Sequence, residues 1–120
     1  LAVGTRPDIA HAVSVLCQFN NCHDKTHWAA AKRLLRYLKG TPNRGLSYNK
    51  EGESIKGYVD ADWGNSIDDR RSYTGLVFTL SGAAVTWASK KQRTVALSST
   101  EAEYIGLTEA TKEAMHLNQF

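Results

Sequence analysis

The sequence predicts an α+β fold in which two helices precede an antiparallel three-stranded meander with a long helix packed on it. Three observations indicate this fold. Apolar residues recur at helical spacing from Ile9 to Leu38, alternate at strand spacing between Ile55 and Ser89, and return to helical spacing after Ser98. The 120 residues, 42% hydrophobic and 22% charged, have the composition of one small globular chain.

The first half is expected to form two helices. Pro7 and Asp8 suit the first turn of the first helix, and Thr5 is a candidate cap. The second helix is expected to begin around Asp24 and to end at Gly40, which fits a C-terminal stop. Its predicted apolar face consists of Trp28, Ala31, Leu34, Leu35 and Leu38.

The opposite face of the second helix is basic. No acidic residue interrupts the segment from Lys32 to Lys39. A charged face of this kind is either a solvated surface or a surface that binds phosphate. The candidate nucleic-acid-binding residues are Lys32, Arg36 and Lys39, with Arg33 beside them.

Strands are expected over 46–48, 55–63, 73–80 and 83–89, the last two joined by a hairpin turn at Ser81-Gly82. In the strand over 55–63, Asp60 and Asp62 share the face opposite the apolar residues Val59 and Ala61. Two carboxylates on one strand face either lie in water at the end of the strand or bind a divalent metal. The strand by itself leaves both interpretations open.

The last helix begins at a strong signal, because Ser98 and Glu101 have the spacing of a capping box. A stripe at helical spacing is expected to pack on the sheet with Glu103 in it, and Glu101 points away from it. Glu103 then either lies near water at the helix end or binds a metal together with Asp60. The stripe consists of Glu103, Gly106, Leu107, Ala110, Ala114 and Leu117.

Several motifs resemble the ribonuclease H region of copia-type LTR retrotransposon Pol polyproteins. The residues that carry the resemblance are Tyr58-Val59-Asp60-Ala61-Asp62-Trp63, Arg71-Ser72-Tyr73-Thr74-Gly75, Trp87-Ala88-Ser89-Lys90-Lys91-Gln92 and 96–104. Segments 5–9 and 27–41 resemble the stretch between reverse transcriptase and ribonuclease H. The resemblance implies a helical connection over 1–45 and the N-terminal part of a truncated ribonuclease H-like domain over 46–120, an incomplete version of that fold.

The resemblance also implies roles for individual residues. Asp60 and Glu103 match catalytic carboxylates that bind two Mg²⁺ ions, with Asp62 as an additional metal ligand. The implied reaction is hydrolysis of the RNA strand of an RNA–DNA hybrid. Phosphate contacts are expected from Lys90, Lys91 and Arg93, which otherwise form a solvated loop. The expected partners are the hybrid and the rest of the Pol polyprotein, including reverse transcriptase.

The chain departs from the family pattern in one respect. The family completes its site with later aspartates, whereas no Asp follows Asp69 here. We therefore expect a fragment that is inactive alone. The alternatives are a non-catalytic nucleic-acid-binding piece and an inert transposon relic.

Cysteine usage and hydropathy suggest a cellular location. The two cysteines, Cys17 and Cys22, fit a reducing compartment. No apolar run approaches a membrane span, and no signal-peptide pattern opens the chain. We expect an intracellular protein, in a cytoplasmic particle or the nucleus, that is not secreted and has no membrane partner.

The formal charge of +3 is compatible with binding to nucleic acid. An alternative zinc set consists of Cys17, Cys22, His23 and His27.

Overall fold

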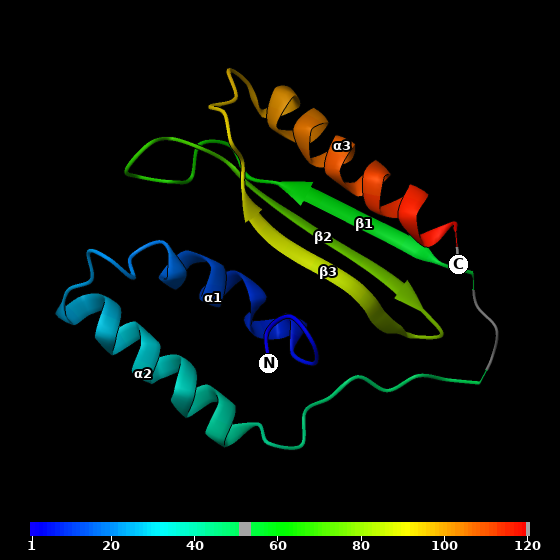
Figure 1. The fold of residues 1–120 in the computed structure, drawn as a ribbon, viewed down its shortest axis with the longest axis horizontal. Coiled ribbons are helices and arrows are strands. Elements are labelled where there is room, and N and C mark those ends of the chain that lie inside the picture. Colours follow the sequence, from blue (N-terminus) through cyan, green and yellow to red (C-terminus); the bar gives the residue numbers. More distant parts are fainter. Residues whose placement is uncertain (51–53, 120) are drawn as a thin grey trace. The chain divides into compact units, whose positions relative to one another are not determined.

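The computed structural model describes residues 1–50 and 54–119 and has the predicted α+β order (Figure 1). A short 3-10 turn, η1 (Pro7–Ile9), leads into α1 (Ala10–Cys17) and α2 (Lys25–Gly40). Three strands and a long helix follow: β1 (Lys56–Ala61), β2 (Tyr73–Leu80), β3 (Ala83–Lys91) and α3 (Ser99–Leu117). The chain divides into two compact units, Leu1–Leu46 and Ser47–Phe120.

The N-terminal unit is held together by a buried arginine. Arg6, 7% exposed, donates from Nε and a terminal nitrogen to both carboxylate oxygens of Asp8, at 2.9 and 2.8 Å. The same guanidinium donates to the carbonyl and hydroxyl oxygens of Thr41, and the Tyr37 hydroxyl donates to Asp8 at 2.7 Å. The start of α1 is thereby joined to the end of α2. The expected cap by Thr5 is wrong, because no side chain caps this helix start.

The start of α2 is as predicted. Asp24 Oδ1 accepts hydrogen bonds from the backbone N–H groups of Thr26 and His27, at 2.8 and 3.0 Å. His27 Nδ1 accepts in return from the Asp24 N–H at 3.1 Å. These bonds satisfy donors that the first helical turn leaves unpaired.

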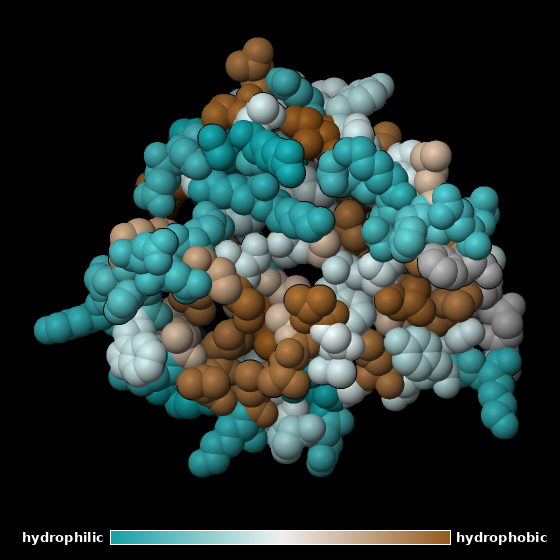
Figure 2. Space-filling model, viewed as in Figure 1, coloured by the Kyte–Doolittle hydropathy of each residue, from teal (hydrophilic) through white to brown (hydrophobic). Residues whose placement is uncertain are grey.

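The predicted apolar face of α2 is only partly correct. Ala31, Leu34 and Leu38 are half-buried, whereas Trp28 and Leu35 are 60% and 61% exposed. Helix α1 has only eight residues. It is too short to cover the whole apolar face of the sixteen-residue α2. Apolar side chains that reach the protein surface appear brown in Figure 2.

The sheet has the order β1-β2-β3, with both pairs antiparallel. The turn between β2 and β3 has φ of 53° at Ser81 and 84° at Gly82, the left-handed geometry of a tight hairpin. The strand predicted over 46–48 is wrong. That segment is irregular, and the Tyr48 hydroxyl donates to the carbonyl of Ala84 at 2.7 Å, so it lies beside the hairpin without pairing as a strand.

Helix α3 lies against the sheet through a stripe of small residues, Ala102, Gly106 and Ala110, all buried. A Cβ on Gly106 would lie 3.4 Å from Val59 Cγ2 and 3.5 Å from Ala61 Cβ. The predicted stripe is therefore partly wrong: Leu107 is 52% exposed, and Glu103 and Ala114 are also exposed. The described residues contain no helix that is long and apolar enough to cross a membrane.

Candidate carboxylate site and basic surfaces

Asp60 lies near the end of β1, opposite Gly75 of β2, and is exposed. Its neighbours Val59 and Ala61 face Gly106 of α3. Successive strand residues point to opposite faces, so Asp60 projects from the face away from α3. Because β1 is the edge strand of the described sheet, this carboxylate stands near an open edge.

The two glutamates at the start of α3 have different environments. Glu101 Oε2 accepts a hydrogen bond from the Leu97 N–H at 2.6 Å, so this carboxylate is used in the helix cap. Glu103 instead lines a cavity of about 530 Å³ with Val59 of β1. The remaining lining residues come from α3: Ser99, Thr100, Tyr104 and Leu107. Glu103 therefore lies beside the residue that precedes Asp60, at the same edge of the sheet.

Asp62 has a structural role in the loop that follows β1. Its Oδ1 accepts from the Tyr73 N–H at 2.6 Å, and its own N–H donates to the Tyr73 carbonyl at 3.1 Å. These two bonds continue the pairing of β1 with β2 past the last strand residue. One Asp62 oxygen is thus already used, which leaves only Oδ2 of this carboxylate outside the strand pairing.

The donor chemistry of these residues suits a hard cation, because Mg²⁺ prefers carboxylate oxygens. The number of donors is low. Within residues 1–50 and 54–119, no three His, Cys, Asp or Glu side chains gather closely enough to hold a metal ion. Asp60, Asp62 and Glu103 are therefore not gathered around one point among the described residues, and three carboxylates are too few for a two-metal site.

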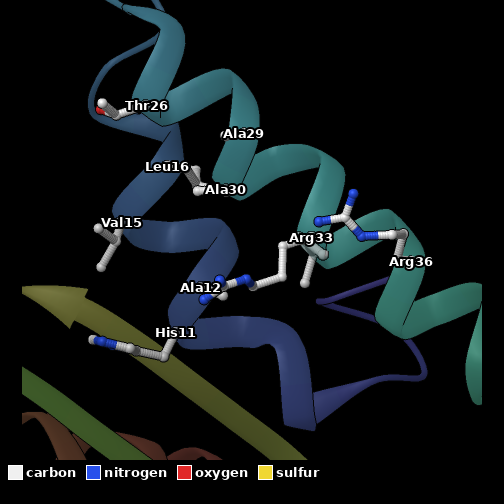
Figure 3. Close-up of a pocket in the computed structure, with 10 residues that line it drawn as sticks. His11, Ala12, Val15, Leu16, Thr26, Ala29, Ala30, Arg33 and Arg36 are labelled. Atoms are coloured by element: carbon white, nitrogen blue, oxygen red, sulfur yellow. The ribbon is translucent and has the colours of Figure 1, made fainter.

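The basic residues of α2 are all on the surface: Lys32, Arg36 and Lys39 are exposed. Arg36 and Arg33 also border an apolar groove of about 680 Å³ between α1 and α2 (Figure 3). In Figure 3 the Arg33 side chain extends from α2 toward Ala12 of α1, and the Arg36 side chain lies beside α2. The structure thus makes these cations accessible to solvent.

The basic residues at the end of β3 and directly after it differ in their contacts. Lys91, the last residue of β3, forms an ion pair with Asp69 at 2.9 Å. Hydrogen bonds from Ser66 and Lys91 lower the pKa of Asp69 to about 2. Lys90 and Arg93 are exposed and border a separate pocket against α3. Lys91 therefore holds a loop, while Lys90 and Arg93 are available to a ligand.

The alternative zinc set receives no support from its geometry. Cys17 and Cys22 are free and exposed. His27 takes part in the Asp24 cap and stacks on Phe19 with ring centroids 4.1 Å apart. Its ring is thus already used to begin α2.

Sequence reasoning missed one residue of functional interest, Gln92. Its side chain is buried, and Nε2 donates to Thr74 Oγ1 and to the Ala102 carbonyl, both at 2.9 Å. These bonds join the end of β3 to β2 and α3. The only signal in the sequence is an uncharged polar residue three positions after the expected strand over 83–89, which is not enough to predict burial.

The sequence is similar to several known proteins over nearly its whole length. The chain is 54% identical over 118 residues to Secreted RxLR effector protein 161 of Plasmopara viticola, covering 98% of this chain and 83% of that protein. It is 52% identical over 118 residues to the Retrovirus-related Pol polyprotein from transposon TNT 1-94 of Nicotiana tabacum. That match covers 98% of this chain but 9% of the polyprotein.

A third relative is the Retrovirus-related Pol polyprotein from transposon RE1 of Arabidopsis thaliana, 44% identical over 110 residues. The match covers 91% of this chain and 8% of that polyprotein. No protein-family model matches the sequence, and no solved structure does. The chain thus spans a small part of the polyproteins that it resembles and most of the effector protein.

Proposed function

Because the chain is homologous over most of its length to copia-type retrotransposon Pol polyproteins, we propose that it is part of the ribonuclease H of such a polyprotein. The reaction is hydrolysis of the RNA strand of RNA–DNA hybrids during reverse transcription. Residues 46–120 would supply the N-terminal part of the ribonuclease H-like domain, and residues 1–45 the helical connection after reverse transcriptase. The partners are the hybrid and the rest of the polyprotein.

The observation that supports this proposal most strongly is the different use of Glu101 and Glu103. Glu101 is held by the Leu97 N–H and closes the helix start. Glu103 has no such role and lines a cavity with Val59, the neighbour of Asp60. A carboxylate on an edge strand and another at the start of the helix beside it are two ligands from separate elements.

In the proposed site Asp60, from the face away from α3, and Glu103, from α3, would hold Mg²⁺ across the open edge of β1, and Asp62 would contribute Oδ2. When bound, the metal ions lower the pKa of the attacking water and stabilise the leaving oxygen. The chain supplies negative charge and fixed ligand positions. Asp62 is positioned by its hydrogen bond to Tyr73, and Glu103 by the well-capped first turn of α3.

The test uses a longer polyprotein segment that contains this chain and continues into the later strands and their aspartates. We expect Mg²⁺-dependent cleavage of an RNA–DNA hybrid that is abolished by Asp60→Asn or by Glu103→Gln. Glu101→Gln is the matched control at the same helix start and should retain cleavage. An active segment that tolerates Glu103→Gln would contradict the assignment.

A second candidate function is non-catalytic binding of nucleic acid. It is favoured by α2, which carries Lys32, Arg36 and Lys39 on its surface and contains no acidic residue from Lys25 to Gly40. Salt-dependent binding without cleavage by the longer segment would favour this function over hydrolysis.

An intracellular location, in a cytoplasmic particle or the nucleus, is also part of the proposal. The relative covered over 83% of its length carries the word secreted in its name, so secretion is the competing possibility. Fractionation of cells that express a tagged form of the complete protein would decide between them. Recovery from the medium would contradict the intracellular location.

A further inference from the structure

A second pocket lies on α3 away from Glu103, where the end of β3 meets the helix. Its volume is about 440 Å³. We call it the Gln92 pocket. Its lining consists of Thr74, Lys90, Lys91, Gln92, Arg93, Thr94, Ile105, Glu109 and Lys112. Four of these nine side chains are cationic and one is acidic.

The charges in the Gln92 pocket leave two cations for a ligand. Lys112 neutralises Glu109 across 2.8 Å, and Lys91 is paired with Asp69. Lys90 and Arg93 form no ion pair with a described residue, 1–50 or 54–119. Their positive charge nevertheless reaches the pocket: the pKa of Glu109 is lowered, chiefly by the Lys112 hydrogen bond and further by Lys90 and Arg93. An anion is the ligand that this balance favours.

Gln92 adds a second, independent feature. Its side chain is 5% exposed, and the bond from Nε2 to the Ala102 carbonyl fixes the amide orientation, because a carbonyl accepts and cannot donate. Its Oε1 is buried and accepts no hydrogen bond from the described residues. Buried polar atoms in proteins are nearly always paired. A hydroxyl donor on a ligand in the pocket would satisfy this acceptor.

We propose that the Gln92 pocket binds one ribonucleotide unit of an RNA strand. Lys90 and Arg93 hold the backbone phosphate, and Gln92 Oε1 accepts a hydrogen bond from the 2′-hydroxyl. The proposal rests on the proposed function only in placing nucleic acid on this chain. DNA has the same phosphate without the 2′-hydroxyl, so the pocket should favour RNA.

The experiment measures binding of single-stranded oligonucleotides to the whole chain by fluorescence anisotropy at several salt concentrations. The probes are RNA, 2′-O-methyl RNA and DNA of one sequence. We expect RNA to bind several-fold more tightly than the other two, since both lack the 2′-hydroxyl donor. Equal affinities for RNA and 2′-O-methyl RNA would overturn the role of Gln92.

Variants test the phosphate contact. Lys90→Ala with Arg93→Ala should reduce the slope of log affinity against log salt by about 1.4, because each phosphate contact on a single strand contributes about 0.7. The matched control is Lys25→Ala with Lys50→Ala, which removes two exposed cations outside the pocket and should keep the RNA preference. An equal loss in both double variants would overturn the site.

Gln92 can be tested with a control for its hydrogen bonds. Gln92→Leu should abolish the preference for RNA. Thr74→Val removes one acceptor of Gln92 Nε2 while leaving Oε1 in place, and should keep the preference. If Gln92→Leu fails to fold, the three probes on the unmodified chain still decide the question.

Further outcomes distinguish a free phosphate from an RNA phosphate as the ligand. They also distinguish failure of this inference from failure of the ribonuclease H proposal. If inorganic phosphate or adenosine monophosphate, at constant ionic strength, displaces RNA from the unmodified chain at micromolar concentration, the pocket serves a free phosphate and the nucleic-acid assignment is overturned. Cleavage that depends on Asp60 and Glu103, together with no ribose preference, would refute this inference alone. A ribose preference without cleavage by the longer segment would refute the ribonuclease H proposal alone.

Discussion

The carboxylate of Glu101 accepts a hydrogen bond from the backbone N–H of Leu97 at 2.6 Å, and this contact separates the two glutamates of α3. In the same turn Ser98 Oγ accepts from the Glu101 N–H at 3.1 Å. The pair resembles a capping box in which the glutamate reaches one residue further back than usual. Glu101 therefore contributes to the stability of the helix start, and Glu103 takes no part in this cap.

The first prediction follows from this cap. Ser98→Ala should lower the free energy of unfolding by about 1 kcal/mol, because it leaves an unpaired N–H at the start of α3. Glu101→Gln should cost less, because the amide oxygen of Gln still accepts from Leu97. Glu103→Gln should leave stability nearly unchanged. Urea unfolding followed by circular dichroism measures all three, and a Glu103→Gln loss as large as that of Ser98→Ala would contradict the division of roles.

The second prediction concerns pH and the N-terminal unit. Hydrogen bonds from Arg6 and Tyr37 hold the pKa of Asp8 far below its ordinary value. A depressed folded-state pKa stabilises the protein above the unfolded value of about 4, and the stabilisation is lost as pH falls below it. The protection of α1 and α2 amides against hydrogen exchange, corrected for the intrinsic exchange rate at each pH, should therefore fall below about pH 4.

Two variants serve as controls for that pH dependence. Asp8→Asn should accelerate exchange at neutral pH and flatten the pH dependence. Tyr37→Phe removes one hydrogen bond to Asp8 and should cost about 1 kcal/mol. Unchanged pH dependence in Asp8→Asn would show that another group is responsible.

The third prediction tests the close approach of α3 to the sheet. A Cβ at Gly106 would be 3.4 Å from both Thr74 Cγ2 and Val59 Cγ2, which is tight but not a severe clash. Gly106→Ala should change stability little, because the gain in helix propensity offsets the crowding. Gly106→Leu should cost about 1–3 kcal/mol by overpacking. Thermal unfolding of the two variants provides the measurement, and an equally stable Gly106→Leu would contradict the packing.

The fourth prediction addresses the basic face of α2. Replacing Lys32, Arg36 and Lys39 together with Ala should weaken hybrid binding and reduce its salt slope by up to about one unit per lost contact. Lys25→Ala, at the exposed start of the same helix, is the control. An unchanged slope in the triple variant would indicate that the face is only solvated.

The fifth prediction follows from the number of ligands. Two-metal hydrolysis requires enough carboxylates to hold two ions about 4 Å apart. Asp60, Glu103 and one oxygen of Asp62 are too few. We expect no measurable Mg²⁺-dependent cleavage of an RNA–DNA hybrid by residues 1–120 alone. Robust cleavage by this chain would show that further ligands have been overlooked.

The features that the sequence predicted well are local. The β2–β3 hairpin depends on Ser81-Gly82, and the starts of α2 and α3 depend on Asp24 and Ser98, so each is encoded within a few residues. The division of the chain into functional regions and the roles of its site residues stay predictions.

The predicted packing face of α3 is turned about the helix axis relative to the observed one, because helical spacing alone cannot choose between overlapping stripes of residues. Hydrophobicity favoured the side with Leu107, whereas the sheet accepts the side with Ala102, Gly106 and Ala110. Small residues are selected there by the short distance to Val59 and Ala61, which only the folded structure reveals. The buried position of Gln92 was hidden for the same reason, because it depends on contacts with Thr74 and Ala102.

The neighbour-to-neighbour pairing of the strands has a consequence for the order of folding. β1 pairs with β2 and β2 with β3, so each pairing joins strands that are adjacent in the sequence and separated by a short loop. Such local pairing favours rapid formation of the sheet. Helix α3 must then return to β1, the first strand of the unit, across a longer loop. During synthesis we expect the meander to form before α3 has emerged completely. The elements that carry Asp60 and Glu103 would then come together in the final step, so that the carboxylates are assembled only after the sheet is in place.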